Sequence, residues 1–461
     1  MTRLRWYGPG LMALLAWGAL SFGAVYAWAY WPLYGGAAAL GVWALVVTRA
    51  WRDPRIRWMA AALAGIVLVL AMQTILLPSW LIGRVSPGVD RFYRLFEVGY
   101  RPAAFHTLSL TPSATVVNLL GTVAFGLLLL GSARAVRSVT VDWLAGQIMG
   151  LGLGVATIGI LQKALGRADH VLVYGFWQPQ AGGNPFGPFI NRNHFAGWMA
   201  MVLPLVAAYS FGLVQRSTRG EASGVSGWMR WGGSVEGNRY LLVSSSGLVM
   251  GGALVLTQSR SGMASLAVAF AVLGGFILGS VRGRWRVVAM TYLALLLVGA
   301  VTWAGADLVT ARFGRAPAEI GGRLSAWRDT VRIVRDFPVF GAGVGAYGQA
   351  MLVYQTGSRE LMYAEAHNDY LQLLAEGGVF LAGAGLTFLV VWAAGVRNRL
   401  RSGNDDVLTY WVRRGAIAGL AGAAAQSVVE FSLQMPGNAV LFVVLAAIAL
   451  HRPRHTDAHR V

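Results

Sequence analysis

Long apolar stretches alternate with short polar segments along most of the chain. A helix needs roughly 20 apolar residues to cross a bilayer, and by that measure the alternation predicts about twelve spanning helices. The expected helices cover residues 9–30, 32–50, 57–77, 113–131, 142–162, 193–215, 240–257, 262–281, 287–305, 371–395, 415–434 and 437–451. The pattern therefore predicts an all-α polytopic membrane protein.

Composition supports the membrane class. Of 461 residues, 56% are hydrophobic and only 12% are charged, which lies outside the range of ordinary soluble domains. The formal net charge is +19, with Lys163 as the only lysine. In a soluble protein this charge would suggest nucleic acid, but here the arginines lie between apolar stretches, so we expect no nucleic-acid partner. Because cysteine is absent, disulfides and thiolate chemistry are excluded.

Arginine clusters mark alternate connections between the expected helices. They fall at residues 3–5, 49–57, 134–137, 216–230, 282–286, 397–414 and 452–454. Short cytoplasmic loops collect lysine and arginine, so we expect these connections and both termini to be cytoplasmic. The first apolar stretch is long enough to span and is interpreted as an uncleaved helix rather than a signal peptide.

The opposite side of the membrane receives the larger polar segments. It is expected to carry outer loops 78–112, 163–192 and 306–370, a tight turn at Gln258–Ser261, and short turns near 31 and 435. These segments retain arginines, which either an anionic substrate or local salt bridges would explain. The predicted organisation is an N-terminal set of helices (1–163), a core (164–395) that contains loop 306–370, and a C-terminal hairpin with a cytoplasmic tail (396–461).

Within loop 306–370, an amphipathic helix is expected to follow Gly321. Apolar residues recur at helical spacing from Leu324 to Val334, whereas Arg323 stands at the N-terminal end and Arg328 on another face. This helix either lies on the bilayer surface or directs Arg323 into a polar site, where free amides at a helix end also favour anions.

A second candidate segment, Glu365–Tyr370, places titratable and polar side chains where this loop meets an apolar helix. Polar side chains without partners at such a position carry a high free-energy cost. A lone histidine such as His367 is most often structural, but neighbouring acids would place its pKa near neutrality, as a general base requires. The surrounding candidates are Glu365, Asn368, Asp369 and Tyr370, with Glu376 about two turns further along.

Two further polar sites lie at the same expected membrane surface. Arg260 occupies a turn between two apolar stretches, where it either snorkels to the interface or clamps a phosphate. Arg192, Asn193 and His194 stand at the start of another expected helix. Helix capping explains Asn193 but not the arginine and histidine beside it.

Several other chemistries find no support in the pattern. The glycine-rich stretch 341–345 is not flanked by a strand–turn–helix unit and is not followed by Gly-Lys-Ser/Thr, so it does not predict a nucleotide site. Paired-acid metal motifs, zinc-ligand spacing and nucleophile elbows are absent from the sequence. We therefore expect no metal and no cofactor.

Together these segments resemble the O-antigen ligase and O-antigen polymerase superfamily of bacterial envelope glycosyltransferases. Four elements occur in the order typical of that family: Phe189–Gly197, Ser259–Gly262, Arg323 with Trp327 leading into Asp336–Gly343, and His367–Glu376. They cover roughly residues 180–380, and their order on one expected face makes the set more specific than any single element.

The resemblance implies transfer of a glycan from undecaprenyl diphosphate to an acceptor hydroxyl, without a metal, at the periplasmic face of the bacterial inner membrane. It implies that His367 is the base and that Arg260 and Arg323 bind the diphosphate. The residues expected to support them are Arg192, Asn193, His194, Arg328, Asn368, Asp369, Tyr370 and Glu376.

Alternatives remain at this point. A ligase would use lipid A-core as acceptor, whereas a polymerase would use another lipid-linked repeat. The motifs do not separate the two, because the donor chemistry is the same; the ligase is only slightly favoured, and protein or other polysaccharide acceptors stay open. A lipid-linked oligosaccharide flippase would line its midplane with polar groups and broken helices, but here the polar groups gather at one face. A membrane scaffold would leave the outer arginines without a purpose.

Overall fold

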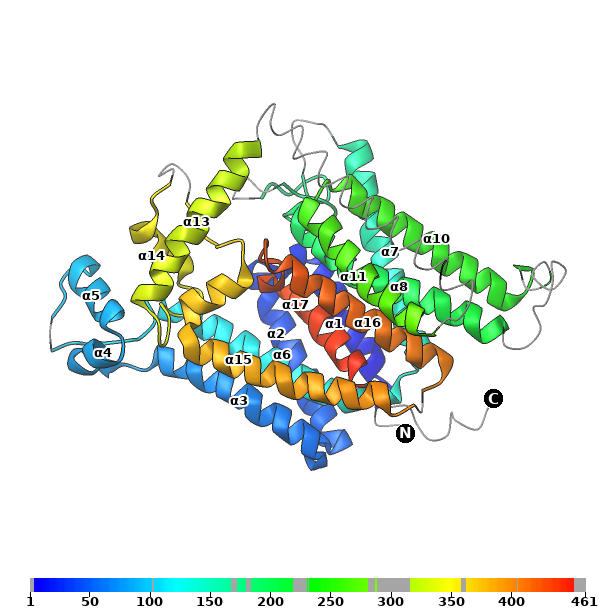
Figure 1. Ribbon diagram of the computed structural model, residues 1–461, viewed down its shortest axis with the longest axis horizontal. Coiled ribbons are helices and arrows are strands. Elements are labelled where there is room, and N and C mark those ends of the chain that lie inside the picture. Colours follow the sequence, from blue (N-terminus) through cyan, green and yellow to red (C-terminus); the bar gives the residue numbers. More distant parts are fainter. Residues whose placement is uncertain are drawn as a thin grey trace.

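The fold is all-α, with helices that run back and forth through one bundle (Figure 1). The computed structural model describes residues 4–101, 103–166, 172–179, 184–218, 230, 232–280, 287, 316–357, 362–403 and 405–451. The bundle helices are α1 (Tyr7–Leu20), α2 (Ala27–Thr48), α3 (Pro54–Thr74), α6 (Pro112–Ala135), α7 (Val141–Leu165), α8 (Arg192–Thr218), α10 (Val235–Leu256), α11 (Arg260–Ser280), α15 (Asp369–Arg401), α16 (Val407–Gln426) and α17 (Pro436–Ala449).

The predicted membrane class is confirmed. In the described part of the chain, eight helices are long and apolar enough to cross a bilayer: α2, α3, α6, α7, α8, α10, α11 and α15. Two shorter apolar helices, α1 and α17, accompany them. The chain is therefore a multi-pass membrane protein. The expected span 287–305 lies outside the described residues except for Val287.

Two helix boundaries differ from the prediction. The first turn is not near residue 31: it falls between α1 and α2, where Phe22, Gly23 and Ala24 all have positive φ, and Pro32 lies inside α2. The expected span 415–434 instead ends at Gln426, which leaves a connection at 427–435 outside any α-helix. Periodicity missed both boundaries because the turn residues are themselves mostly apolar.

The start of α16 was also misplaced by the prediction. Arg413 and Arg414, expected in a cytoplasmic loop, lie inside this helix and are buried. Arg413 forms an ion pair with Asp405 and donates a hydrogen bond to the His451 carbonyl at 2.5 Å. Burial of a charge is tolerated when it is paired in this way.

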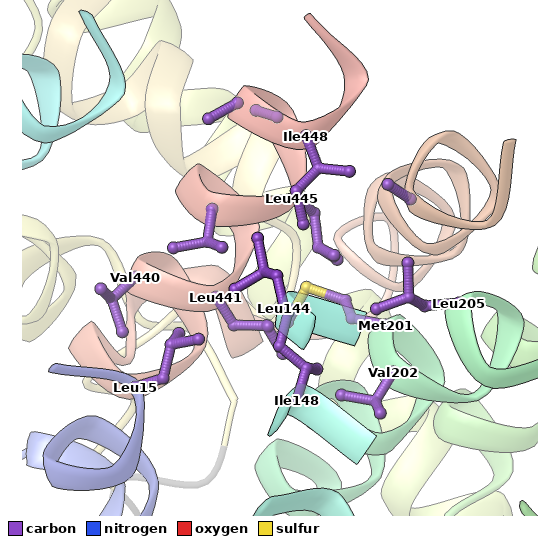
Figure 2. Close-up of a cluster of buried hydrophobic side chains, with 14 of the residues drawn as sticks. Leu15, Leu144, Ile148, Met201, Val202, Leu205, Val440, Leu441, Leu445 and Ile448 are labelled. Carbon is purple, nitrogen blue, oxygen red and sulfur yellow. The ribbon is translucent and has the colours of Figure 1, made fainter. Parts of the chain in front are cut away.

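The core of the bundle lies between α1, α7, α8 and α17 (Figure 2). Each of these helices contributes an almost completely buried side chain to the core: Leu15 from α1, Leu144 from α7, Met201 from α8 and Leu441 from α17. Helix α16 packs along α8, and small residues let the two backbones approach closely. A Cβ atom added at Gly419 would lie 2.4 Å from the Met201 carbonyl oxygen.

The bundle has two chemically different ends. One end, which we term the site end, carries β1 (Leu77–Pro78), β2 (Phe105–His106), α4 (Ser79–Val85), α5 (Pro87–Phe96), α13 (Ala316–Asp336), α14 (Tyr347–Tyr354) and η5 (Ser432–Gln434). The strands pair antiparallel, with Leu77 opposite His106. Figure 1 shows α4, α5, α13 and α14 beyond the ends of α3 and α15. The other end, termed the arginine-rich end, carries η3 (Ala50–Arg52) and η4 (Val136–Ser138).

The glycine-rich stretch 341–345 lies between α13 and α14 in the chain and packs against α15. Gly341 has φ 69°, and a Cβ there would lie 2.1 Å from the Glu376 carbonyl carbon, so only glycine fits. Gln73, in the last turn of α3, donates hydrogen bonds to the Phe340 carbonyl at 2.6 Å and to the Glu376 carbonyl at 2.8 Å. The stretch is thus a packed turn between two helices.

Substitution of Gly419 tests the close approach of α8 and α16. We expect Gly419→Ala to lower the unfolding free energy by about 1–3 kcal/mol, because the added methyl group meets backbone that has no room to move. Thermal unfolding in detergent measures this loss. Gly251→Ala is the matched control, since a Cβ at that glycine of α10 meets nothing within 4 Å. Equal unfolding temperatures for the two variants would contradict the packing argument.

Candidate active site

A buried carboxylate, Glu430, organises the site end. Its side chain is only 1% exposed and accepts hydrogen bonds from Arg323 Nη2 at 2.8 Å and from Asn193 Nδ2 at 2.8 Å. Nδ1 of His367 lies 3.4 Å from its other oxygen. Three residues from distant parts of the chain thus meet on one acid.

The surroundings keep Glu430 ionised. Burial alone would raise the pKa of this carboxyl, but the hydrogen bond from His367 and the positive charge of Arg323 outweigh burial and hold that pKa below its usual value. An ionised carboxylate can only accept hydrogen bonds. The Nδ1 atom of neutral His367 therefore carries the hydrogen, and its Nε2 atom keeps a lone pair.

His367 is held in an unusual backbone conformation. Its φ is +50°, a left-handed value that is costly for a residue with a Cβ. The preceding Ala366 is held on both sides: its carbonyl accepts from Trp327 Nε1 at 2.9 Å, and its amide donates to Gln372 Oε1 at 2.9 Å. On the other side, Asn368 caps α15 by accepting from the Leu371 amide at 2.9 Å. These contacts fix the ring, which stays 32% exposed.

Arg323 lies in α13 and reaches the same corner. Besides its ion pair with Glu430, it donates from Nη1 to the Val429 carbonyl at 3.2 Å. Its side chain remains 37% exposed. The guanidinium is therefore fixed on one side by protein acceptors and open to an anion on the other.

Asn193 connects this corner to the turn that contains Arg260. Its Oδ1 atom accepts from Ser259 Oγ at 2.8 Å, and Ser259 Oγ in turn accepts from the Gly262 amide at 3.2 Å. Arg260, the next residue after Ser259, begins α11 and is exposed. The motif segments that carry Arg260, Arg323, Asn193 and His367 are thus joined through Glu430 and Asn193.

Residues expected near Asn193 take different positions. His194 is buried, and its ring lies edge-on to Phe431 at 4.9 Å between centroids. Phe431 meets His367 in the same way at 5.0 Å, so His194 supports the site through this phenylalanine. Arg192 lines a small neighbouring pocket together with Lys163.

Other expected supporting residues lie around the start of α15. Asp369 accepts from Gln434 Nε2 at 2.8 Å, and its amide donates to the Ser427 carbonyl at 2.8 Å. Tyr370 donates to the Ala424 carbonyl at 2.8 Å. Both residues therefore tie α15 to the end of α16. Arg328 is exposed on α13.

Glu365 and Glu376 belong to an adjoining polar cluster. Gln372 Nε2 donates to Glu365 Oε2 at 2.5 Å and lies 3.4 Å from Glu376 Oε1. Glu376 is buried and also accepts from the Tyr347 amide at 3.1 Å. Burial raises the pKa of Glu365 to about 7, although the hydrogen bond from Gln372 opposes the rise. This cluster holds α14 and α15 together beside His367.

Sequence reasoning missed Glu430 itself. The residue fell inside the expected span 415–434, so it was treated as part of an apolar helix. A signal was present, since an acid inside a membrane segment is expensive and usually functional. Within the described residues, no group of three or more His, Cys, Asp or Glu side chains is placed to hold a metal ion.

A family match covers part of the chain that forms this site. A model of the O-antigen ligase family matches residues 246–384, the segment that holds Arg260, Arg323 and His367 but neither Asn193 nor Glu430. No curated protein matches the chain. The membrane helices and this family match together support a membrane glycosyltransferase of the ligase and polymerase type. The match confirms the resemblance predicted from the sequence over residues 246–384, which do not include the first motif element, Phe189–Gly197.

The pKa of Glu365 yields a pH-dependent prediction. A carboxyl whose pKa rises on folding, here from 4.5 to about 7, stabilises the fold below the lower value and loses that contribution as pH rises through the higher one. We expect the unfolding temperature of the wild type to fall across this interval relative to Glu365→Gln, whose side chain does not titrate. Thermal unfolding at several pH values measures the difference.

The control for this pH series is Glu236→Gln, which changes an exposed acid in the first turn of α10. Its curve should follow the wild type. Parallel curves for wild type and Glu365→Gln would show that this carboxyl does not titrate differently in the folded protein.

Proposed function

We propose that this protein transfers a glycan from undecaprenyl diphosphate to an acceptor hydroxyl at the periplasmic face of the bacterial inner membrane. The observation that supports it most is the pairing of His367 and Arg323 on one buried acid. A base and a fixed cation beside each other suit a reaction in which a hydroxyl loses a proton while a diphosphate leaves.

His367 is the proposed base. Its Nε2 lone pair accepts the acceptor's proton as the hydroxyl oxygen forms its bond to the anomeric carbon. Glu430, opposite Nδ1, stabilises the resulting imidazolium, as a carboxylate does for the histidine of a catalytic triad. The partial exposure of the ring leaves room for an acceptor to approach.

Arg323 and Arg260 are the proposed diphosphate ligands. As the anomeric carbon–oxygen bond breaks, its electron pair departs with the diphosphate, and fixed guanidinium groups stabilise that charge. Arg323 has protein acceptors for two of its donors and presents its remaining N–H groups outward. Arg260 stands where α11 begins, at the positive end of the helix dipole, which favours an anion at the same position.

The proposed location follows from the two ends of the bundle. Arginines at 49–57, 134–137 and 397–401 belong to the end opposite the site, and short cytoplasmic loops attract such clusters. With both termini at the cytoplasmic end, the site faces the periplasm, where a flipped lipid-linked donor is accessible. No nucleotide is needed, because the diphosphate already activates the sugar.

We propose lipid A-core as the acceptor, which makes the protein a ligase. In the decisive experiment, purified protein receives undecaprenyl-diphosphate glycan with lipid A-core or with more donor alone. Ligated core is the expected product. A lengthened glycan ladder without ligated core would replace the ligase with a polymerase that uses a lipid-linked repeat.

Two substitutions test the proposed roles in the same assay. We expect His367→Ala to lower turnover at least about a hundredfold, because no base remains, and Arg260→Ala to lower it by about 10²–10³ through loss of charge stabilisation. Product formation is followed by gel. Arg397→Ala, an exposed arginine on α15 far from the site, should retain wild-type turnover. Full activity in both site variants would overturn the assignment.

Glu430→Gln tests how the acid acts. Arg323 and Asn193 both donate to one oxygen of this side chain, so a glutamine would turn its amide nitrogen toward His367 Nδ1. That contact favours the tautomer with hydrogen on Nε2, and the base is lost. We expect kcat to fall about 10³–10⁴-fold with little change in KM. Glu236→Gln is the matched control, and an unchanged kcat would show that Glu430 has only a structural role.

A further inference from the structure

A pocket of about 570 Å³ lies at the site end, outside the corner that Glu430 organises. It is formed where α5 meets the end of α13 and α14, and Figure 1 shows these helices beyond the ends of α3 and α15. The pocket therefore lies beyond the membrane-spanning helices, where a glycan is accessible. Its lining residues take no part in the proposed proton and diphosphate chemistry.

The walls of this pocket are firmly packed. A Cβ atom added at Gly88, at the start of α5, would lie 2.1 Å from the Asp336 carbonyl oxygen, so α5 contacts the end of α13 directly. Val89 is fully buried in one hydrophobic cluster with Phe337, whose ring centroid lies 6.2 Å from that of Tyr354. Three helices thus fix the shape of the pocket before a ligand binds.

Positive charge exceeds negative charge in the lining. Arg91 of α5 and Arg335 of α13 line the pocket with one acid, Asp336, which accepts a hydrogen bond from the Tyr354 hydroxyl at 2.5 Å. Neither arginine forms an ion pair among the described residues. Two guanidinium groups beside one carboxylate favour a ligand with a carboxylate or a phosphate, which arginine binds in a bidentate manner.

Aromatic rings form another part of the lining. Phe92 and Phe96, one turn apart on α5, lie 5.0 Å apart between ring centroids, and Phe96 is 52% exposed. A sugar ring has an apolar face of C–H groups, which packs on such rings, and a polar rim. Apolar walls with a few charged groups are usual for sites that bind organic ligands, whereas an inorganic anion gains nothing from the rings.

Helix α13 sets the distance between this pocket and the proposed diphosphate site. Arg335 and Arg323 lie on the same helix, and at 1.5 Å per residue they are about 18 Å apart along its axis. A glycan covers that distance with several sugar units. A ligand in the pocket is therefore a remote part of a substrate whose reacting end lies at His367.

We propose that this pocket binds an acidic sugar unit, one with a carboxylate or a phosphate, in a remote part of a glycan substrate. Arg91 and Arg335 bind its acid group, and Phe92 and Phe96 contact its apolar face. The inference rests on the proposed glycosyl transfer and adds a subsite to it. Contacts with a remote part of the substrate lower KM for glycans that carry this unit.

The first test measures binding without turnover, so it can fail while the proposed transfer holds. Tetragalacturonic acid and mannose 6-phosphate are titrated into the protein in neutral detergent, beside their neutral matches maltotetraose and mannose, and saturation-transfer NMR follows binding. We expect at least one acidic sugar to bind about fivefold more tightly than its neutral match. Equal binding within both pairs, or full displacement of the acidic sugar by equimolar inorganic phosphate or phosphatidylglycerol, would overturn the proposal.

Substitutions locate the binding site. Arg91→Gln/Arg335→Gln should abolish the preference for the acidic sugar. Arg84→Gln/Arg101→Gln removes the same charge from exposed positions at the site end, outside the pocket, and should keep the preference. Phe96→Ala should weaken binding of the acidic sugar and of its neutral match alike, because both lose the ring. Equal loss of preference in the two double variants would show that only general charge attracts the sugar.

The transfer assay identifies which substrate carries the acid. Arg91→Gln/Arg335→Gln should raise KM about fivefold for either the donor or the acceptor, with little change in kcat, because a remote contact binds ground state and transition state alike. The affected substrate is the one that reaches the pocket. Unchanged KM for both substrates would overturn the subsite, whereas absence of transfer by the wild type would contradict the proposed function instead.

Discussion

The buried carboxylate of Glu430 is the interaction on which the site depends. An ionised acid with 1% exposure is stable only if cations and donors surround it, and Arg323, Asn193 and His367 meet that requirement from three directions. The carboxylate in turn fixes the positions of these three side chains. Removal of the charge would release all three at once.

The bundle provides the rigidity that this arrangement needs. Close contacts such as Gly419 against Met201 hold α16 to α8, and α16 leads directly into the connection that carries Glu430, while α8 begins with Asn193 next to it. The left-handed backbone of His367 is likewise held by contacts on each side. Strain at a proposed catalytic residue is thus borne by well-packed neighbours.

The two ends of the molecule use arginine differently. At the site end, Arg323 is paired with an acid yet partly open, which suits charge that appears only as a diphosphate leaves. At the opposite end, Arg413 is buried and forms an ion pair with Asp405, which suits a permanent role in packing. The same side chain therefore suits transient charge stabilisation in one environment and permanent pairing in the other.

The amino-acid sequence alone determined the membrane class, the alternation of arginine-rich connections and four motif segments, because apolar length and charge placement are local properties. It led to His367, Arg260 and Arg323 as candidates. The sequence did not predict the ends of α1 and α16, where apolar residues form turns. Glu430 was therefore assigned to an expected membrane span. Only the tertiary structure decided which acid joins the motifs, since that depends on contacts between residues more than a hundred positions apart. Glu376 shows the converse: it lies close in sequence to His367, yet packing places it in an adjoining cluster with Gln372 and Tyr347.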